Sequence, residues 1–163
     1  MDRVDRKILA LLQANGSVPG PELAKAVGIS STPCWRRVQK LEEEKVISRR
    51  VALLDAAKIN AAVTVFVSIR VTTHSTEWLR RFSEVVTSFP EVVEFYRMSG
   101  EVDYLMRVVV PDVAGYDAFY KRLVAKVEIG NVSSQFAMQE LKFTTELPLS
   151  YLDISNPKEA RGR

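Results

Sequence analysis

Apolar side chains recur at helical spacing through the first 45 residues, in three successive groups. The first group begins after Asp2, whose carboxylate can cap a helix, and we expect Asn15-Gly16 to stop that helix in a left-handed conformation. The second begins at Pro21, which suits a first helical position, and ends at Gly28. The apolar positions are Val4, Ile8, Leu11 and Leu12 in the first group and Leu23, Ala24 and Val27 in the second.

The third group defines a helix that Ser30 or Thr32 can cap, with Pro33 tolerated because it falls in the first turn. At about 100° per residue, one arc of this helix is suited to packing and the opposite arc to solvent, while Trp35 and Arg37 flank both. The packing arc holds Cys34, Val38, Leu41 and Lys45, and the outward arc holds Arg36, Gln39, Lys40 and Glu43.

The polar residues of this third helix change from basic to acidic along its length, with Glu42 to Glu44 at the end. A recognition helix inserts its N-terminal half into the major groove, so this order keeps the acidic end away from phosphate. An ordinary exposed helix face is the alternative meaning of the same bases. We predict a helix-turn-helix, of winged-helix-like type, that binds double-stranded DNA. Its expected contact residues are Ser31, Thr32, Pro33, Trp35, Arg36, Arg37, Gln39 and Lys40.

Val46 to Leu54 is apolar at both ends and is expected to form a strand that leads out of this unit. Arg49 and Arg50 within it either touch phosphate or lie in a solvated turn, and the sequence leaves both readings open. Residues 55–62 have the composition of a connector.

From Val63 the apolar period changes to two, which is typical of a strand with one buried face. Thr76 can cap the helix that follows, and Pro90 stops it. The alternating apolar positions are Val63, Val65, Val67, Ile69 and Val71, and the helical ones are Leu79, Phe82, Val86 and Phe89.

Two further strands, Val92 to Ser99 and Tyr104 to Val110, are close enough to form a hairpin around Gly100. Asp112 can cap a second helix, and the last strand is expected from Val132 to Leu147. The apolar side of that second helix carries Tyr116, Phe119, Leu123 and Val127.

The resulting order is strand, helix, strand, strand, helix, strand, which predicts a ferredoxin-like βαββαβ domain and an α+β fold class. We expect a helix-turn-helix domain at 1–50, a linker at 51–62, the ferredoxin-like domain at 63–150 and a frayed tail at 151–163. Such a sheet has helices on one face only. The strand Tyr104 to Val110 is apolar at nearly every position except Arg107, so the second face also requires cover, and a homodimer provides it.

Composition places the chain among ordinary soluble globular proteins, with 47% hydrophobic and 26% charged residues. No apolar run approaches the roughly 20 residues of a membrane span, and no signal-peptide pattern is present, so we expect a cytoplasmic protein without membrane contact. Cys34 and His74 are single residues of their kinds, which argues against a disulfide or a zinc site. We therefore expect Cys34 in the core, His74 in a loop, and no metal, cofactor or enzymatic activity.

The net charge of +3 resides in the N-terminal third of the chain. Residues 1–55 carry 10 Lys and Arg against 7 Asp and Glu, whereas residues 56–163 carry 13 of each. Because nucleic-acid affinity depends largely on phosphate neutralisation, this distribution places DNA contacts in the first third and leaves the remainder another role.

The chain also resembles the Lrp/AsnC family of bacterial and archaeal transcriptional regulators. The stretches that carry the resemblance are DRVDRKILALLQANG, ELAKAVGISSTPCWRRVQKLEEEKVI, MSGEVDYLMRVVVPD and SSQFAMQELKFTTELPL. It covers nearly the whole chain and implies a ligand-sensing and oligomerisation domain after the helix-turn-helix, assembled as a dimer and then as a higher oligomer such as an octamer. It also implies that a bound amino acid adjusts transcription of amino-acid metabolism genes.

In that family the effector lies between dimers, near the loop of the central hairpin and the start of the last strand. By this resemblance, Gly100 would let backbone amides approach a carboxylate, and Asp103 could pair with an ammonium group. A plain hairpin turn and solvated charges are the alternative. The implied effector-binding residues are Met98, Ser99, Gly100, Glu101, Val102, Asp103, Tyr104, Val132, Ser133 and Ser134.

Glu101 and Val132 depart from the aspartate and threonine that are frequent in the family at these places. These departures suit an alternative function, a DNA-wrapping architectural protein that responds to no effector.

Overall fold

The computed structural model describes residues 1–71 and 75–153, and the chain divides into two compact units. The first comprises Met1–Leu53 together with the stretch that begins at Lys142, and the second comprises Leu54–Leu141. The expected loop at His74 and the part of the expected tail after residue 153 lie outside the described residues. Within the described ranges, no helix is both long and apolar enough to cross a bilayer.

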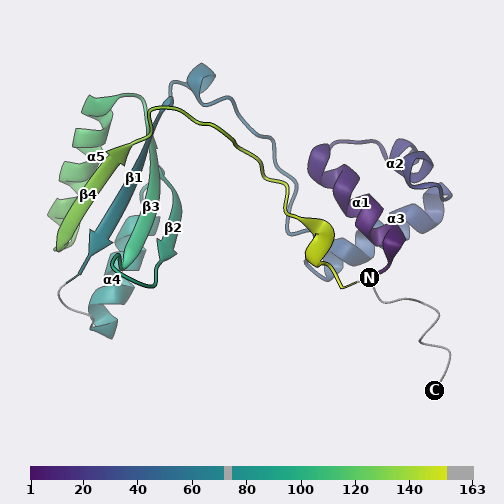
Figure 1. Ribbon diagram of the computed structural model, residues 1–163, viewed down its shortest axis with the longest axis horizontal. Helices are drawn as coiled ribbons and strands as arrows, with labels where there is room; N and C mark the ends of the chain where they lie inside the picture. The colour runs from purple at the N-terminus through teal and green to yellow at the C-terminus, as the bar shows by residue number, and fades with distance from the viewer. Residues whose placement is uncertain (72–74, 154–163) are drawn as a thin grey trace. The chain divides into compact units, whose positions relative to one another are not determined.

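Three helices pack around a small apolar core in the first unit (Figure 1). They are α1 (Arg3–Ala14), α2 (Gly20–Val27) and α3 (Ser31–Glu43), as the helical spacing predicted. Gly28 ends α2 in the left-handed conformation at φ 85°, which an achiral residue adopts without strain. The buried residues of this core are Ile8, Leu9, Leu23, Ala24, Val27, Cys34, Val38 and Leu41.

Three details of the helix ends differ from expectation. Asn15 ends α1 in an extended conformation, because its side chain accepts hydrogen bonds from the amide and hydroxyl of Ser17 and closes the turn locally. Ser30 occupies the N-cap position of α3 but its hydroxyl makes no capping bond, and Thr32 lies inside the helix. Lys45 follows the helix end at φ 58° and is exposed, so it does not belong to the packed arc.

The expected strand from Val46 to Leu54 is wrong. The segment runs without regular structure to the short 3-10 helix η1 (Ala57–Ile59), and Val51 and Leu54 are exposed. A strand requires a neighbour that satisfies its amides and carbonyls, and no strand in the described part of the chain pairs with this segment.

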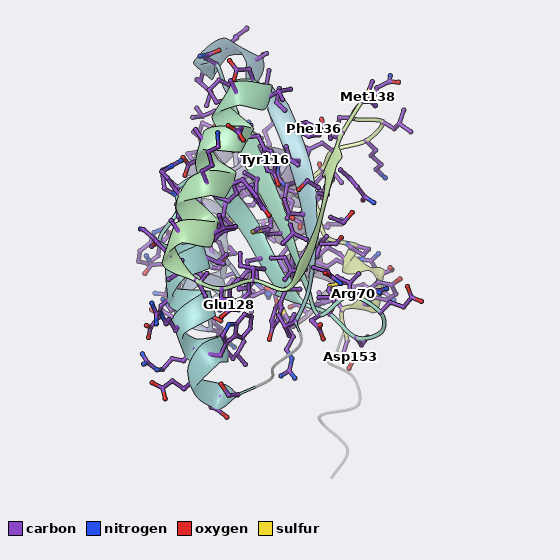
Figure 2. The ribbon with its side chains drawn as sticks, turned by 90° about the vertical axis from the view of Figure 1, so that its left-hand side faces the viewer. Arg70, Tyr116, Glu128, Phe136, Met138 and Asp153 are labelled. Atoms are coloured by element: carbon purple, nitrogen blue, oxygen red, sulfur yellow. The ribbon has the colours of Figure 1, made fainter. Side chains whose placement is uncertain are left out.

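The second unit is a four-stranded antiparallel sheet with two helices on one face (Figures 1 and 2). The strand order β2-β3-β1-β4 is that of a ferredoxin-like fold, which confirms the predicted class. The elements are β1 (Val63–Arg70), α4 (Thr76–Thr87), β2 (Val92–Arg97), β3 (Tyr104–Val110), α5 (Val113–Lys126) and β4 (Asn131–Phe136).

Side-chain alternation along the central strands decides which face of the sheet is buried. On β1, Val65, Val67 and Ile69 are fully buried beneath the helices, whereas Phe66 and Arg70 lie on the open face. Alternate residues of β3 are buried in the same way. The core is completed by Phe82 and Val86 from α4, by Tyr116, Phe119 and Leu123 from α5, and by Tyr104, Met106, Val108 and Val110 from β3.

Three further bounds differ from the predicted ones, and the first is the end of β2 at Arg97, where Ser99 was expected. The N-cap of α4 is Ser75, whose hydroxyl accepts from the Trp78 amide, and the expected cap Thr76 is the first helical residue. The last strand ends at Phe136, opposite Val65, and one further backbone hydrogen bond joins the Ala137 amide to the Thr64 carbonyl at 2.9 Å before the pairing with β1 stops.

After β4 the chain joins the first unit. We call residues 142–153 the C-terminal strap. The amide side chain of Gln13 donates to the Leu147 carbonyl at 3.1 Å and accepts from the Leu147 amide at 2.7 Å. The 3-10 helix η2 (Leu149–Tyr151) follows, and Leu149 and Leu152 pack against the core of the three helices. The structure thus groups residues 142–150 with the helices, whereas the sequence analysis placed them in the sheet domain.

Candidate nucleic-acid interface and ligand site

The outward face of α3 presents most of the residues that the sequence predicted as DNA contacts. This follows from the helical period, since Cys34, Val38 and Leu41 are buried on the opposite side. Trp35 is 59% exposed, and Gln39 is half-buried. The exposed residues of the predicted set are Ser31, Thr32, Pro33, Trp35, Arg36 and Lys40.

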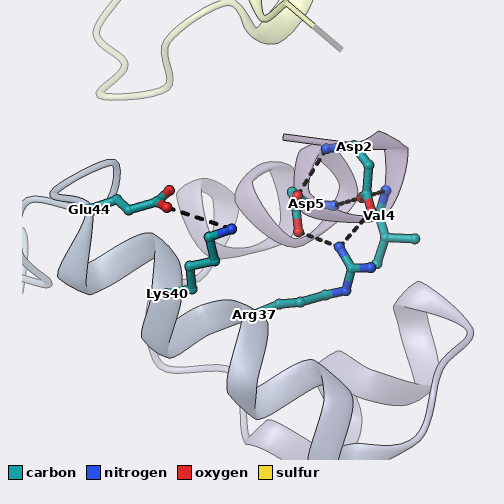
Figure 3. Close-up of polar contacts among 6 residues, drawn as sticks. All are labelled: Asp2, Val4, Asp5, Arg37, Lys40 and Glu44. Carbon is teal, nitrogen blue, oxygen red and sulfur yellow. Dashed lines mark hydrogen bonds and ion pairs between the residues drawn. The ribbon is translucent and has the colours of Figure 1, made fainter. Parts of the chain in front are cut away.

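Arg37 is the exception, because its guanidinium binds α1 (Figure 3). Its Nη1 atom donates to Asp2 Oδ2 and to Asp5 Oδ1, each at 2.7 Å. Partial burial acts to raise the pKa of the Asp2 carboxyl, but hydrogen bonds from the Asp5 amide, Arg37 and the Val4 amide outweigh burial and lower that pKa. Asp2 is therefore ionised at neutral pH, and Arg37 has a charged partner. The sequence analysis missed this contact.

The other basic residues of the unit differ in how firmly they are held. Lys40 Nζ lies 3.6 Å from Glu44 Oε1, and both side chains are exposed (Figure 3). The guanidinium of Arg50 donates to Glu42 at 3.0 Å and to the carbonyl of Gly16 at 3.3 Å. These contacts favour a structural role for Arg50 over both a phosphate contact and a solvated turn. Within the described part of the chain, the side chains of Arg36 and Arg49 have no hydrogen-bond or ion-pair partner. Exposed arginine side chains without an internal partner can neutralise phosphate without breaking an internal contact.

The loop between β2 and β3 carries six of the predicted ligand residues. The Met98 amide donates to the Asp103 carbonyl at 2.8 Å, and between them Gly100 has a φ of 107°, which favours glycine. The Asp103 amide donates to the Ile69 carbonyl at 3.0 Å, and the Asp103 carboxylate accepts from the Val71 amide at 2.9 Å. Asp103 therefore ties this loop to the end of β1.

Arg70, labelled in Figure 2, belongs to the same end of the sheet, and sequence reasoning missed it. Its Nη2 atom lies 2.9 Å from Glu101 Oε2, with both side chains exposed. A Cβ atom on Gly130 would lie 2.3 Å from the Arg70 carbonyl oxygen, so glycine permits this close approach of the chain entering β4. The alternation of buried and exposed residues along β1 puts Arg70 on the open face, and this alternation in the sequence could have identified Arg70 as a residue of this surface.

The three predicted residues on β4 do not share a face. Val132 and Ser134 pair with buried positions of β1 and face the helices, whereas Ser133 faces away. The hydroxyl groups of Ser134 and Tyr116 are hydrogen-bonded, and the Phe136 ring packs edge-on against Tyr116 at 5.3 Å between centroids (Figure 2). Burial raises the pKa of the Tyr116 hydroxyl, which keeps it neutral.

Strand register brings the loop and the beginning of β4 to one end of the sheet. Ile69 pairs with Tyr104 on one side and with Val132 on the other. The loop and Val132 therefore flank the end of β1, next to Arg70. Tyr104 is only 4% exposed and belongs to the core, so its side chain is not on this surface.

Two family models match the chain. One is described as an AsnC-type helix-turn-helix domain and covers residues 1–42, and the other as an Lrp/AsnC ligand binding domain and covers residues 64–147. Among curated proteins, the DNA-binding transcriptional activator DecR of Escherichia coli (strain K12) is 50% identical over 150 residues, which span 91% of this chain and 99% of DecR. The glutamate uptake regulatory protein of Zymomonas mobilis is 46% identical over 149 residues, 91% of each chain.

Solved structures show the same likeness over both units. A crystal structure of an AsnC family transcriptional regulator from Agrobacterium tumefaciens matches with a TM-score of 0.91 and 68% identity, over 93% of this chain and 99% of that one. A transcriptional regulator from Neisseria meningitidis in complex with L-Met matches with a TM-score of 0.89 and 31% identity, over the same shares.

Proposed function

The chain belongs to the Lrp/AsnC family of transcriptional regulators, and from that premise we propose that it is a sequence-specific regulator of amino-acid metabolism genes under the control of an amino-acid effector. The observation that carries the proposal is the exposed N-terminal half of α3. Its hydroxyl and cationic side chains precede the acidic residues, which lie at the C-terminal end of the helix. The relatives of this chain are regulators by name, and DecR is named as a DNA-binding transcriptional activator.

DNA contacts come from α3 in this proposal. Arg36 and Lys40 bind phosphate or guanine edges, and the hydroxyls of Ser31 and Thr32 contact neighbouring groups in the major groove. The ion pair of Lys40 is long and exposed, so phosphate can replace it at small cost.

The salt dependence of DNA binding tests this assignment. The probe is a duplex that the protein itself selects from a randomised library, and anisotropy titrations give its dissociation constant at several salt concentrations. We expect log K to fall linearly with log salt, and Arg36→Ala to lower the slope by about one unit per monomer. Arg80→Ala, an exposed arginine of α4 paired with Glu84, is the matched control and should leave the slope unchanged. A wild-type slope near zero would contradict DNA binding through phosphates.

The proposed effector is an amino acid, by analogy with the L-Met complex of the Neisseria relative and with the name of the Zymomonas glutamate uptake regulator. We place its site at the loop 98–104 and the start of β4 at 132–134. Amides near Gly100 would receive the α-carboxylate, and Glu101 or Asp103 the ammonium group.

Calorimetric titration with each of the twenty amino acids tests the effector site. We expect heat of binding for at least one of them, and its loss in Gly100→Ala, because a side chain at φ 107° strains the loop. Gly20→Ala is the control, since a Cβ there meets nothing within 4 Å. Absence of heat and of thermal shift for all twenty would instead favour the effector-independent architectural alternative.

We further propose a homodimer that buries the open face of the sheet and assembles to a higher oligomer, with an octamer as the expected size. Arg107 lies on this face and donates to Glu94 Oε1 at 2.9 and 2.6 Å, so the face can be covered without leaving that guanidinium unpaired. A two-fold dimer also suits paired DNA half-sites. The apolar residues of the face are Phe66, Tyr96, Leu105 and Val109.

A further inference from the structure

The carboxylates of Asp2 and Asp5 form a preorganised receptor at the N-terminus of α1 (Figure 3). Asp2 Oδ1 accepts from the amides of Val4 at 2.8 Å and of Asp5 at 2.9 Å, and Asp5 Oδ2 accepts from the Asp2 amide at 2.9 Å. These bonds fix the rotamers of both carboxylates. The remaining oxygen of each accepts from the same atom, Nη1 of Arg37.

The charges around Arg37 disfavour its use as a phosphate contact. The guanidinium faces two carboxylates, and the positive end of the α1 dipole offsets part of their surplus negative charge. A phosphate that approached Arg37 would also approach Asp2 and Asp5, and like-charge repulsion would oppose it. Arg36 and Lys40 on the same helix have no such neighbours on α1.

The same contact constrains the rotation of α3. Burial of Cys34, Val38 and Leu41 determines which face of α3 points outward, to within the width of that apolar stripe. The two hydrogen bonds from Arg37 to carboxylates of fixed rotamer further restrict the rotation of α3 about its own axis. Since Arg37 lies between the outward Arg36 and the buried Val38, the rotation set at Arg37 determines where Arg36 points.

From this geometry we propose that Arg37 is a positioning residue for DNA recognition, which holds α3 on α1 in the orientation that reads base edges, and that it does not bind phosphate. The inference rests on the proposed DNA binding, and it reassigns one of the residues that the sequence predicted as a contact. Loss of the Arg37 contact should therefore reduce discrimination between duplexes rather than the number of phosphates neutralised.

Three variants test the proposal with the full-length protein, the selected duplex and a scrambled duplex of equal composition. Arg37→Ala removes the guanidinium. Asp2→Asn combined with Asp5→Asn keeps the cap acceptors and removes both charges, and the triple variant combines all three changes. Thermal unfolding confirms that each variant is folded at the temperature of the titrations, and Arg37→Lys, which keeps the charge, provides a milder second change at the same position.

We expect Arg37→Ala and the double Asn variant each to lower the ratio of the two affinities on the order of 10-fold. The triple variant should be no worse than Arg37→Ala, because all three changes remove one contact. The salt slope of Arg37→Ala should equal that of the wild type, and Arg37→Lys should retain more discrimination than Arg37→Ala. A mere loss of stability would leave the ratio unchanged in folded protein.

The proposal is overturned if Arg37→Ala lowers the salt slope as Arg36→Ala does, or if the double Asn variant keeps or improves discrimination. Either result would make Arg37 a phosphate contact that its aspartates restrain. Failure of the wild type to select any duplex is a different result, because it would refute the proposed function together with this inference.

Discussion

At the scale of the residue, Asp2 serves both a helix end and a contact between helices. One carboxylate oxygen caps α1 through the amides of Val4 and Asp5, and the other accepts from Arg37. A helix cap contributes about 1 kcal/mol, and a charged partner adds to it when the pair is partly buried. The cap needs only an acceptor oxygen, but the charged contact with Arg37 requires the ionised carboxylate, so the stability of this unit depends on pH through that contact.

The lowered pKa of Asp2 sets the direction of that dependence. A carboxyl whose pKa is lower in the folded state contributes stability that is fully present above its unfolded pKa of about 3.9 and is lost as the pH falls through the folded value. Asp2→Asn keeps the cap acceptor but cannot titrate. We expect the difference in unfolding free energy between wild type and Asp2→Asn, measured by urea denaturation, to shrink as the pH falls below 4. A difference that stays constant with pH would show that the Asp2 pKa is not lowered.

Gly28 provides a second test at this scale. Its φ of 85° disfavours any side chain, although a Cβ would meet no atom within 4 Å. Gly28→Ala should therefore lower the free energy of unfolding by about 1 kcal/mol through backbone strain alone. Gly20→Ala, in the first turn of the same helix and without a positive φ, should be neutral or slightly stabilising. Equal effects of the two changes in urea denaturation would be the contrary result.

At the scale of the element, the C-terminal strap completes the three-helix unit. Three helices in about 45 residues form a core that is marginal on its own. Leu149 and Leu152 extend this core, and Gln13 binds both backbone groups of Leu147. The stability of the DNA-binding unit therefore depends on residues from the other end of the chain.

Alanine substitutions in the strap test this dependence. Leu152 is partly buried against the helix core, whereas its neighbour Tyr151 is 84% exposed. Leu152→Ala should lower the opening free energy of the amides of α1 to α3, measured by hydrogen exchange, by about 1–2 kcal/mol. This is less than the loss expected for a fully buried leucine, because Leu152 is only partly buried. Tyr151→Ala should leave it within about 0.5 kcal/mol. The same protection in both variants would mean that the strap does not support the helices.

At the scale of the whole molecule, the uncovered face of the sheet determines the assembly that we propose. The helices α4 and α5 bury the inner residues of β1 and β3 on one face, while Phe66, Tyr96 and neighbouring apolar residues remain on the other. Large apolar patches on one face of a sheet mark association surfaces. Two copies joined through this face would together carry two recognition helices.

Sedimentation of open-face variants tests the proposed dimer. Phe66→Glu adds a second carboxylate beside the Arg107–Glu94 pair, which leaves one negative charge of the three uncompensated at the centre of this face. It should raise the dimer dissociation constant at least about 10-fold, since burying an uncompensated charge costs several kcal/mol. Val113→Glu makes the same kind of change at an exposed apolar residue of α5 and should leave assembly unchanged. A wild type that sediments as a monomer at micromolar concentration would refute the dimer itself.

Local physics explains which features were predictable from the sequence. Helix caps at Asp2 and Asp112 and the left-handed stop at Gly28 involve residues within a few positions of one another. The strand Tyr104–Val110 was predicted at its observed bounds because its sequence favours a strand and both neighbours were available. The outward face of α3 followed from the helical period alone.

Long-range contacts explain what the sequence did not determine. Val46 to Leu54 and residues 138–147 have apolar character suited to strands, yet in the described part of the chain neither segment pairs with a strand, and a strand exists only with a partner. Arg37 and Arg36 are adjacent and chemically identical, and only the folded chain brings Asp2 and Asp5 to one of them. By itself, the sequence determined most of the elements, the family and the exposed face of α3, because these depend on residue types, periodicity and short-range capping. The tertiary structure alone decided which charges are paired and where the C-terminal strap docks, because those contacts join residues far apart in the chain.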